Sequence, residues 1–304
     1  MILREVNENL NTELATLSTL NDVIRWAVSR FNEANIFLGH GTNTMWDEAL
    51  ALILPALFLK YDLPEQAWYA HLTFSELKKV FNLIELRVRY RIPTAYLTNT
   101  ARFCHLSFYV DPRVLIPRSP IAECILKNFH PWINTDRPLR ILDLCTGSGC
   151  IAIACAYYFP NAIVDAVDIS SEALAVAEMN VKKTACANPI NLYQGDLFNP
   201  VKNNKYDLII SNPPYVDQAD LKNLPKEYSY EPVLALYGGE DGLKLVKNIL
   251  AHAKDFLNPK GILVVEVGNS EEALIEEFPE IPFTWLEFEQ GEDGVFLLER
   301  EDIG

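Results

Sequence analysis

The sequence predicts an α/β protein in which a mostly parallel sheet, covered by helices on both faces, follows a small helical domain. Two observations lead to this expectation: apolar runs alternate with helical stretches from residue 139 onward, and residues 1–92 show helical periodicity without a clear strand. Alternation of strands and helices is typical of parallel sheets, because each crossover helix packs back onto the sheet. The length of 304 residues suits one large and one small domain.

The small domain, residues 1–100, is expected to be helical. Residues 14–31 carry an apolar stripe at helical spacing, formed by Leu17, Leu20, Ile24 and Val28. Residues 73–90 repeat this pattern. Because one apolar face per helix must be buried, we expect these helices to pack against one another.

A β-hairpin linker is predicted over residues 101–120. The stretch 103-FCHLSFYVDPRVLIP-117 is rich in aromatic and β-branched residues around the turn signal Asp111-Pro112, which favours two short strands. Residues 118–135 are expected to form a helix that leads into the large domain, residues 121–304.

The large domain is predicted to contain seven strands in a Rossmann-like arrangement. The segments with strand composition are 139–145, 162–169, 191–196, 206–211, 261–268, 283–290 and 294–300. Helices are expected at residues 171–183 and 240–257. The last two strand segments flank a glycine-containing turn, residues 291–294, which predicts a hairpin at the sheet edge with an antiparallel last strand.

A glycine turn follows the first core strand, in 143-DLCTGSGCIAIA-154. Gly147 and Gly149 would let the backbone approach a ligand, and Asp168, nineteen residues after Gly149, would accept hydrogen bonds from a ribose diol. The same glycines with Ala152 also fit a relaxed dinucleotide pattern, so nicotinamide binding stays open at this point.

Asp143 favours a different cofactor from nicotinamide. A carboxylate expected at the mouth of the turn suits a ligand with an ammonium and a sulfonium group better than a pyrophosphate, which indicates S-adenosylmethionine. Asp196 is expected to accept from the adenine amino group. The candidate cofactor-binding residues are Asp143, Thr146, Gly147, Gly149, Asp168, Asp196, Leu197 and Asn212.

The motif 212-NPPY-215 directly follows a predicted buried strand. Ligands of doubly wound sheets bind beyond the carboxyl ends of the strands, so Asn212 is expected to face the cofactor. Pro213 and Pro214 have fixed φ angles and no amide hydrogens, which leaves a stiff segment of outward-facing carbonyls. We expect a planar NH2 group to donate to the Asn212 side chain and the Pro213 carbonyl, while Tyr215 stacks on it.

This arrangement suits methyl transfer to a conjugated nitrogen. Acceptors on both hydrogens stabilise the positive charge that grows on the nitrogen, each by roughly 1.5–3 kcal/mol. The motif alone leaves adenine in DNA, guanine in RNA and glutamine in proteins open as substrates. The polar stretch 216–232 is expected to order over the substrate, with Glu231-Pro232 as an anchor.

The chain resembles the HemK-like protein-(glutamine-N5) methyltransferases over nearly its whole length, through its helical first domain, its hairpin linker, 143-DLCTGSG-149, Asp168 and 212-NPPY-215. Within that family it is most similar to the branch that modifies a glutamine of large-subunit ribosomal protein L3. The segments that carry this second similarity are 38-LGHGTNTMWDEAL-50, 91-RIPTAYLTN-99, 103-FCHLSFYVD-111, 115-LIPRSPIAE-123, 215-YVDQADLKNLPKEYSYEP-232 and 284-TWLEFEQGEDGVF-296.

The resemblance implies a class I S-adenosylmethionine-dependent methyltransferase with a substrate-recognition domain at residues 1–100 and a catalytic domain at residues 121–304. It implies that Gly147, Gly149 and Asp168 bind the cofactor, that Asn212 and Pro213 hold the substrate amide, and that Tyr215 packs on it. Glutamine methylation of class-I peptide release factors and methylation of adenine in DNA remain as alternatives.

The charge distribution bears on the partner. The net charge is −15; residues 1–100 hold nine Lys/Arg and eleven Asp/Glu, so the remaining residues carry most of the negative charge. Such a domain would repel free nucleic acid and attract a basic ribosomal protein, although solubility alone also explains an acidic surface. The start of the chain lacks signal-peptide character, dispersed histidines predict no metal site, and six cysteines without paired spacing predict free thiols. We therefore expect a cytoplasmic protein without membrane attachment or direct DNA binding.

Overall fold

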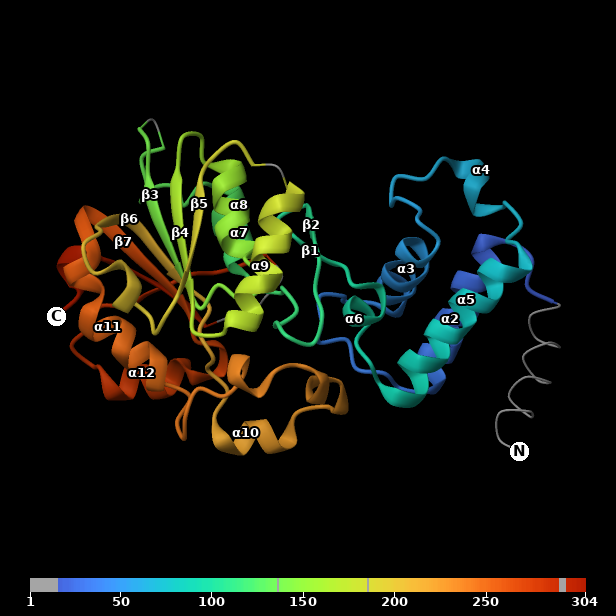
Figure 1. Ribbon diagram of the computed structural model, residues 1–304. Helices are drawn as coiled ribbons and strands as arrows, with labels where there is room; N and C mark the ends of the chain where they lie inside the picture. Colours follow the sequence, from blue (N-terminus) through green and yellow to red (C-terminus); the bar gives the residue numbers. More distant parts are fainter. Residues whose placement is uncertain (1–15, 136, 185, 290–293) are drawn as a thin grey trace. The chain divides into compact units, whose positions relative to one another are not determined.

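The computed structural model describes residues 16–135, 137–184, 186–289 and 294–304 (Figure 1). The chain divides into two compact units, residues 1–100 and residues 101–304. The predicted α/β sheet with an antiparallel last strand, preceded by a helical region, is confirmed.

The first unit is built from short amphipathic helices. Its helices are α2 (Leu20–Glu33), α3 (Met45–Ala56), α4 (Glu65–Trp68), α5 (Phe74–Glu85), which continues into the π-helical turn η1 (Leu86–Tyr90), and α6 (Thr94–Thr98). Capping boxes start α2 and α5: Thr19 and Asp22, and likewise Thr73 and Glu76, exchange side-chain and backbone hydrogen bonds. Of the predicted stripe, Leu17, Leu20 and Ile24 are buried, whereas Val28 only flanks the core.

A buried ion pair lies inside this first unit. The Arg87 guanidinium, 1% exposed, donates to Glu48 Oε1 at 2.6 Å, and the Thr94 hydroxyl donates to the same oxygen at 2.7 Å. Arg87 also donates to the Phe37 carbonyl at 2.7 Å. These bonds join α3, the π-helical turn and α6, so losing either charge would leave the other buried and uncompensated.

The hairpin that opens the second unit is shorter than predicted and turns elsewhere. Strands β1 (Ala101–Phe103) and β2 (Leu106–Phe108) pair antiparallel around a two-residue turn at Cys104 and His105, both with positive φ. The turn signal Asp111-Pro112 lies beyond β2, so that part of the prediction is wrong. A two-residue hairpin turn with two positive φ angles usually carries Asn or Gly, and these residues gave no such signal.

Seven strands form one sheet within the described part of the second unit, in the order β5-β4-β3-β6-β7-β9-β8. The bounds are β3 (Arg140–Leu144), β4 (Ile163–Asp168), β5 (Ile190–Gln194), β6 (Tyr206–Ser211), β7 (Leu257–Glu266), β8 (Thr284–Trp285) and β9 (Val295–Glu299). β9 runs antiparallel between β7 and β8, and β8 forms the edge. The predicted turn residues 291–293 lie outside the described residues.

Helices cover both faces of this sheet (Figure 1). They are α7 (Ile121–Leu126), α8 (Cys150–Tyr158), α9 (Ser171–Thr184), α11 (Lys244–Phe256) and α12 (Glu271–Glu277), whereas α10 (Gln218–Asn223) has no buried residue and lies apart from the sheet. Adjacent residues of β3 face opposite cores: Ile141 packs with α7 and α8, whereas Leu142 packs with α11. α7 ends at Leu126, much earlier than predicted, because Asn128 and Phe129 adopt positive φ angles. No helix in the described ranges is long and apolar enough to cross a membrane.

Candidate active site at the carboxyl edge of the sheet

The strand order changes direction between β3 and β6. From β3 the chain proceeds outward through β4 to β5, then returns to add β6 on the other side of β3. The loops after β3 and β6 therefore lead to opposite sides, and doubly wound proteins bind ligands at such a point, beyond the carboxyl ends of the strands. The order β5-β4-β3-β6 brings the ends that carry Asp196, Asp168, the glycine loop and Asn212 to this edge.

Asp143 lies beneath the glycine loop, not at its open mouth as expected. It is fully buried, and its Oδ2 accepts from the Thr146 hydroxyl at 2.5 Å and from the Ala152 amide at 3.0 Å. Burial raises its pKa to about 7. Its Oδ1 is also buried and has no hydrogen-bond partner among the described residues, which leaves one acceptor available beneath the loop.

The two glycines of the loop differ in their surroundings. Gly149 has a φ of +79°, and a Cβ there would lie 3.1 Å from the Ala177 Cβ, so this residue allows close packing of α9. Gly147 has a φ of +55°, and a Cβ there would meet nothing within 4 Å. The backbone at Gly147 therefore borders open space, as a ligand-binding loop requires.

Asp168 ends β4 and faces this loop. Its Oδ2 accepts from the Gly147 amide at 2.8 Å, and its Oδ1 accepts from the Ser170 amide at 2.9 Å. Burial raises its pKa, and the backbone hydrogen bonds oppose that rise. Each oxygen keeps a second lone pair for another donor. The neighbouring Ile169, which no sequence pattern indicated, is a large aliphatic side chain that is 55% exposed at this edge.

Asp196 and Leu197 follow β5 beside Asp168. The Gly195 amide donates to the Asp168 carbonyl at 3.0 Å, which fixes the start of this loop. Asp196 is exposed, whereas Leu197 is buried with a positive φ of 45°. The strain of a left-handed leucine fits a turn that directs Asp196 outward.

The segment 212–215 begins directly after β6. The Ser211 hydroxyl donates to the Leu144 carbonyl at 3.0 Å and so joins the ends of β6 and β3. Pro213 and Pro214 are buried. Asn212 is half-buried, and its side-chain amide has no hydrogen bond to any described residue. A polar side chain held at a strand end without a partner is available to a ligand.

Tyr215 is held in place by a hydrogen bond and by close packing. Its hydroxyl donates to Glu266 Oε1 at 2.9 Å, and burial together with the Glu266 carboxylate raises its pKa well above the usual value. A Cβ on Gly268 would lie 2.6 Å from the tyrosine ring, so the ring lies against the Gly268 backbone. No sequence pattern indicated Glu266, which lies at the end of an ordinary apolar strand.

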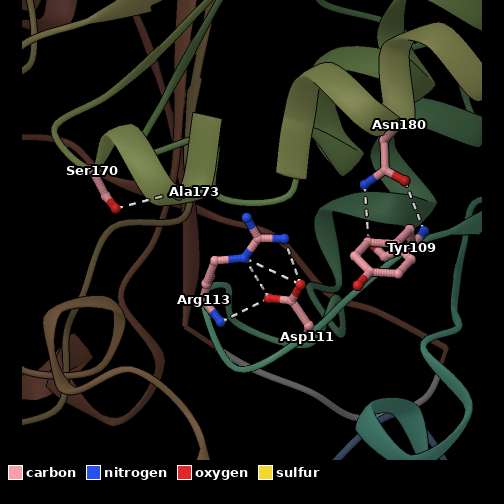
Figure 2. Close-up of polar contacts among 6 residues, drawn as sticks. All are labelled: Tyr109, Asp111, Arg113, Ser170, Ala173 and Asn180. Carbon is pink, nitrogen blue, oxygen red and sulfur yellow. Dashed lines mark hydrogen bonds and ion pairs between the residues drawn. The ribbon is translucent and has the colours of Figure 1, made fainter. Parts of the chain in front are cut away.

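A third residue that no sequence pattern indicated, Asn180, fastens the linker to the glycine loop. Figure 2 shows its amide facing the backbone of Tyr109. Asn180 Oδ1 accepts from the Tyr109 amide at 2.7 Å, and Nδ2 donates to the Tyr109 carbonyl at 3.0 Å and the Ser148 carbonyl at 2.9 Å. Nearby, Arg113 forms a two-pronged ion pair with Asp111. These contacts place the linker beside the predicted cofactor site.

A pocket of about 250 Å³ adjoins Tyr215. Its lining residues are Tyr215, Val216, Asp217, Asp220, Asn223, Leu224, Pro225, Asn269 and Ser270. No cluster of three or more metal-ligating side chains occurs in the described ranges. All six cysteines are free, as predicted.

Comparison with known proteins identifies the family. The model of the family "Methyltransferase small domain" matches residues 124–226. The ribosomal protein uL3 glutamine methyltransferase of Francisella tularensis is 46% identical over 94% of this chain and 92% of its own length. The enzyme of the same name from Neisseria meningitidis is 48% identical over 96% of this chain and 97% of its own length.

Among solved structures, a methyltransferase from Pyrococcus furiosus is similar over 74% of this chain and 98% of its own, with 18% identity and a TM-score of 0.47. The two curated relatives match nearly end to end and at far higher identity. On that similarity, the chain belongs to the family of ribosomal protein uL3 glutamine methyltransferases.

Proposed function

We propose that this enzyme transfers a methyl group from S-adenosylmethionine to the side-chain amide nitrogen (N5) of a glutamine in ribosomal protein uL3, which is the large-subunit protein L3. The names of the two curated relatives support the substrate. The observation that supports the chemistry is the Asn212 side chain, which stands at the end of β6 without a hydrogen-bond partner among the described residues.

The residues at the sheet edge fit S-adenosylmethionine. The unpaired Asp143 Oδ1 is an acceptor for an ammonium group, and the open space at Gly147 leaves room for the ligand. Thr146 holds Asp143 in place, and Asp168 has lone pairs left for a ribose diol. Gly149 lets the loop turn tightly. We assign Asp196 to the adenine amino group, and Leu197 and Ile169 to the faces of the base.

The NPPY segment activates the substrate amide. The Asn212 side-chain oxygen accepts one amide hydrogen and the Pro213 carbonyl accepts the other, while Tyr215 packs on the flat face of the amide. Pro213 and Pro214 have no N–H groups that would compete for these acceptors. Both hydrogen bonds strengthen as positive charge grows on the nitrogen, so they stabilise the transition state more than the bound substrate.

S-adenosylmethionine, when bound, supplies a methyl group on a positively charged sulfur. Because this sulfur leaves as a neutral thioether, it needs no acid catalyst. No described side chain at Asn212 is assigned as a base, since the amide proton can leave after methyl transfer. The acceptors of the NPPY segment therefore carry the catalytic contribution of the protein.

The substrate is a basic ribosomal protein, which the negative charge of residues 101–304 would attract in the cytoplasm. We assign substrate recognition to the helical residues 1–100, S-adenosylmethionine binding and catalysis to residues 121–304, and the hairpin linker to residues 101–120. Metal ions, membranes and direct DNA contacts have no role in this proposal.

The test is transfer of labelled methyl from S-adenosylmethionine to purified uL3, a class-I peptide release factor and DNA in parallel reactions. We expect label on uL3, at a single glutamine located by mass spectrometry. Label on the release factor alone would keep the chemistry and refute the substrate. Label on DNA alone would refute both the substrate class and the reasoning from charge.

A further inference from the structure

A buried carboxylate, Glu266, lies between Tyr215 and the linker. Glu266 ends β7 and is 5% exposed. Its Oε1 accepts from the Tyr215 hydroxyl at 2.9 Å, and its Oε2 accepts from the Ser119 hydroxyl at 2.5 Å. Hydrogen bonds from hydroxyl groups to a carboxylate are short and stronger than bonds between neutral groups. The carboxylate thus links Tyr215 to Ser119, which lies 147 positions before Glu266 in the sequence.

The orientation of the Tyr215 ring is fixed by more than this hydrogen bond. The ring carbons Cε2 and Cζ would lie 2.6 Å and 3.0 Å from a Cβ on Gly268, so only glycine permits this close approach. The Ser270 hydroxyl donates to the Tyr215 carbonyl at 3.1 Å and holds the backbone. The part of the ring that lies against Gly268 is therefore closed to a ligand.

A second buried carboxylate, Glu231, fastens the segment that follows Tyr215. Its side chain is fully buried, and its two oxygens accept from Arg118 at 2.7 and 2.8 Å. The Ile116 amide also donates to Glu231, at 2.9 Å. The Arg118 guanidinium lies over the Tyr228 ring, 5.2 Å from its centre. This pairing confirms the anchor expected at Glu231.

The two carboxylates hold one continuous segment at two points. Residues 216–237 form a loop that begins and ends beside the NPPY motif, because Val216 pairs with Tyr237 in an isolated β-bridge. Glu266 fastens Tyr215, directly before this loop, and Glu231 fastens the later part of the loop. Both partners, Ser119 and Arg118, come from the same short linker stretch.

We propose that Glu266 and Glu231 are positioning residues for methyl transfer, because they lock Tyr215 and residues 216–237 onto linker residues 116–119. Glu266 sets the angle of the Tyr215 ring, and Glu231 holds the loop 216–237 beside it. The inference rests on the proposed function, in which Tyr215 packs on the substrate amide. Neither carboxylate touches the substrate. Glu266 acts through the Tyr215 ring, and Glu231 acts through the backbone of the loop 216–237.

The experiment compares full-length Glu266→Gln and Glu266→Ala with the wild type. A glutamine oxygen can still accept from Tyr215, so Glu266→Gln should lose about 3- to 10-fold in kcat for uL3 methylation, whereas Glu266→Ala should lose about 30-fold or more. The cofactor Kd should stay within about twofold in both, because neither variant alters the glycine loop. Glu178→Gln, at an exposed helix glutamate that pairs with Lys182 and with no other described residue, is the matched control.

Tyr215→Phe provides the test of mechanism. If Glu266 acts through the tyrosine hydroxyl, adding Glu266→Gln to Tyr215→Phe should lower kcat by less than about twofold more, since the shared interaction is already lost. Fully additive losses would overturn the proposal. A well-folded Glu266→Ala enzyme with wild-type kcat, or with equal losses in kcat and cofactor affinity, would overturn it as well.

Hydrogen exchange keeps this inference separable from the proposed function. Amides of the non-proline residues in 215–237 should exchange faster in Glu266→Ala and in Glu231→Gln than in wild type, whatever the substrate proves to be. If the wild type does not label uL3, the proposed function fails, and exchange alone decides whether the two carboxylates lock the segment. Unchanged exchange rates in both variants would refute the proposal that the two carboxylates hold this segment against the linker.

Discussion

The substitution Asn212→Ala separates activity from stability. The Asn212 side chain is half-buried and forms no hydrogen bond within the described structure, so its removal should change the free energy of unfolding by no more than about 0.5 kcal/mol. In the transition state the same side chain accepts a hydrogen bond from a nitrogen that gains positive charge. Losing such a bond costs roughly 1.5–3 kcal/mol, or about a 10- to 150-fold decrease in kcat.

The assay is steady-state methylation of uL3 with saturating S-adenosylmethionine, alongside cofactor binding by calorimetry. We expect kcat to fall by about 100-fold while the cofactor Kd changes by less than about threefold. Asn248→Ala, which truncates an exposed amide on α11, is the control and should match the wild type. Equal losses in kcat and cofactor affinity would refute the reasoning, because Asn212 would then mainly build the cofactor pocket.

Three further predictions concern charged groups. Asp168→Asn should weaken cofactor binding by at least about 10-fold in calorimetry, because the new NH2 group would face a backbone N–H donor, at either Gly147 or Ser170; an unchanged Kd would remove Asp168 from the ribose role. Asp143 has a pKa raised to about 7 by burial, and its ionised form is the one that pairs with an ammonium, so cofactor affinity should increase as the pH rises through 7. That pH dependence should be lost in Asp143→Asn, and its persistence there would assign it to another group. Arg87→Met should destabilise the first unit by about 3–5 kcal/mol in chemical unfolding, because Glu48 is left buried and unpaired; a loss below about 1 kcal/mol would contradict this.

The sheet was predictable because its signals are local. Each core strand is a short apolar run bounded by polar or turn residues, and alternate residues of β3 do face opposite cores. The position of Asn212 followed from the strand before it and the prolines after it. Prolines restrict the backbone wherever they occur, so this inference needed no knowledge of distant contacts.

The remaining features depend on contacts between residues far apart in the sequence. Glu266 meets Ser119 across 147 positions, and Asn180 meets Tyr109 across 71. Nothing in the local sequence distinguishes these side chains from ordinary strand and helix residues. The burial of Asp143 escaped prediction for a related reason, since it depends on how α8 closes over the end of β3.

The prediction of the hairpin turn was wrong for a different reason. The prediction relied on Asp111-Pro112, a turn dipeptide, while the chain turns at Cys104 and His105 with positive φ angles. Residues without turn preference adopt such angles when the surrounding packing stabilises them. Here Cys104 is buried in the core beside the hairpin.

The most direct test of the central claim is the chemical nature of the methylated group in uL3. Acid hydrolysis of labelled uL3 breaks side-chain amides, so a methyl group on the glutamine N5 nitrogen should be released as volatile labelled methylamine. We predict that nearly all the label appears as methylamine and that Asn212→Ala lowers its yield in proportion to the loss of kcat. Label recovered as methanol or as a methylated lysine or arginine would contradict the account.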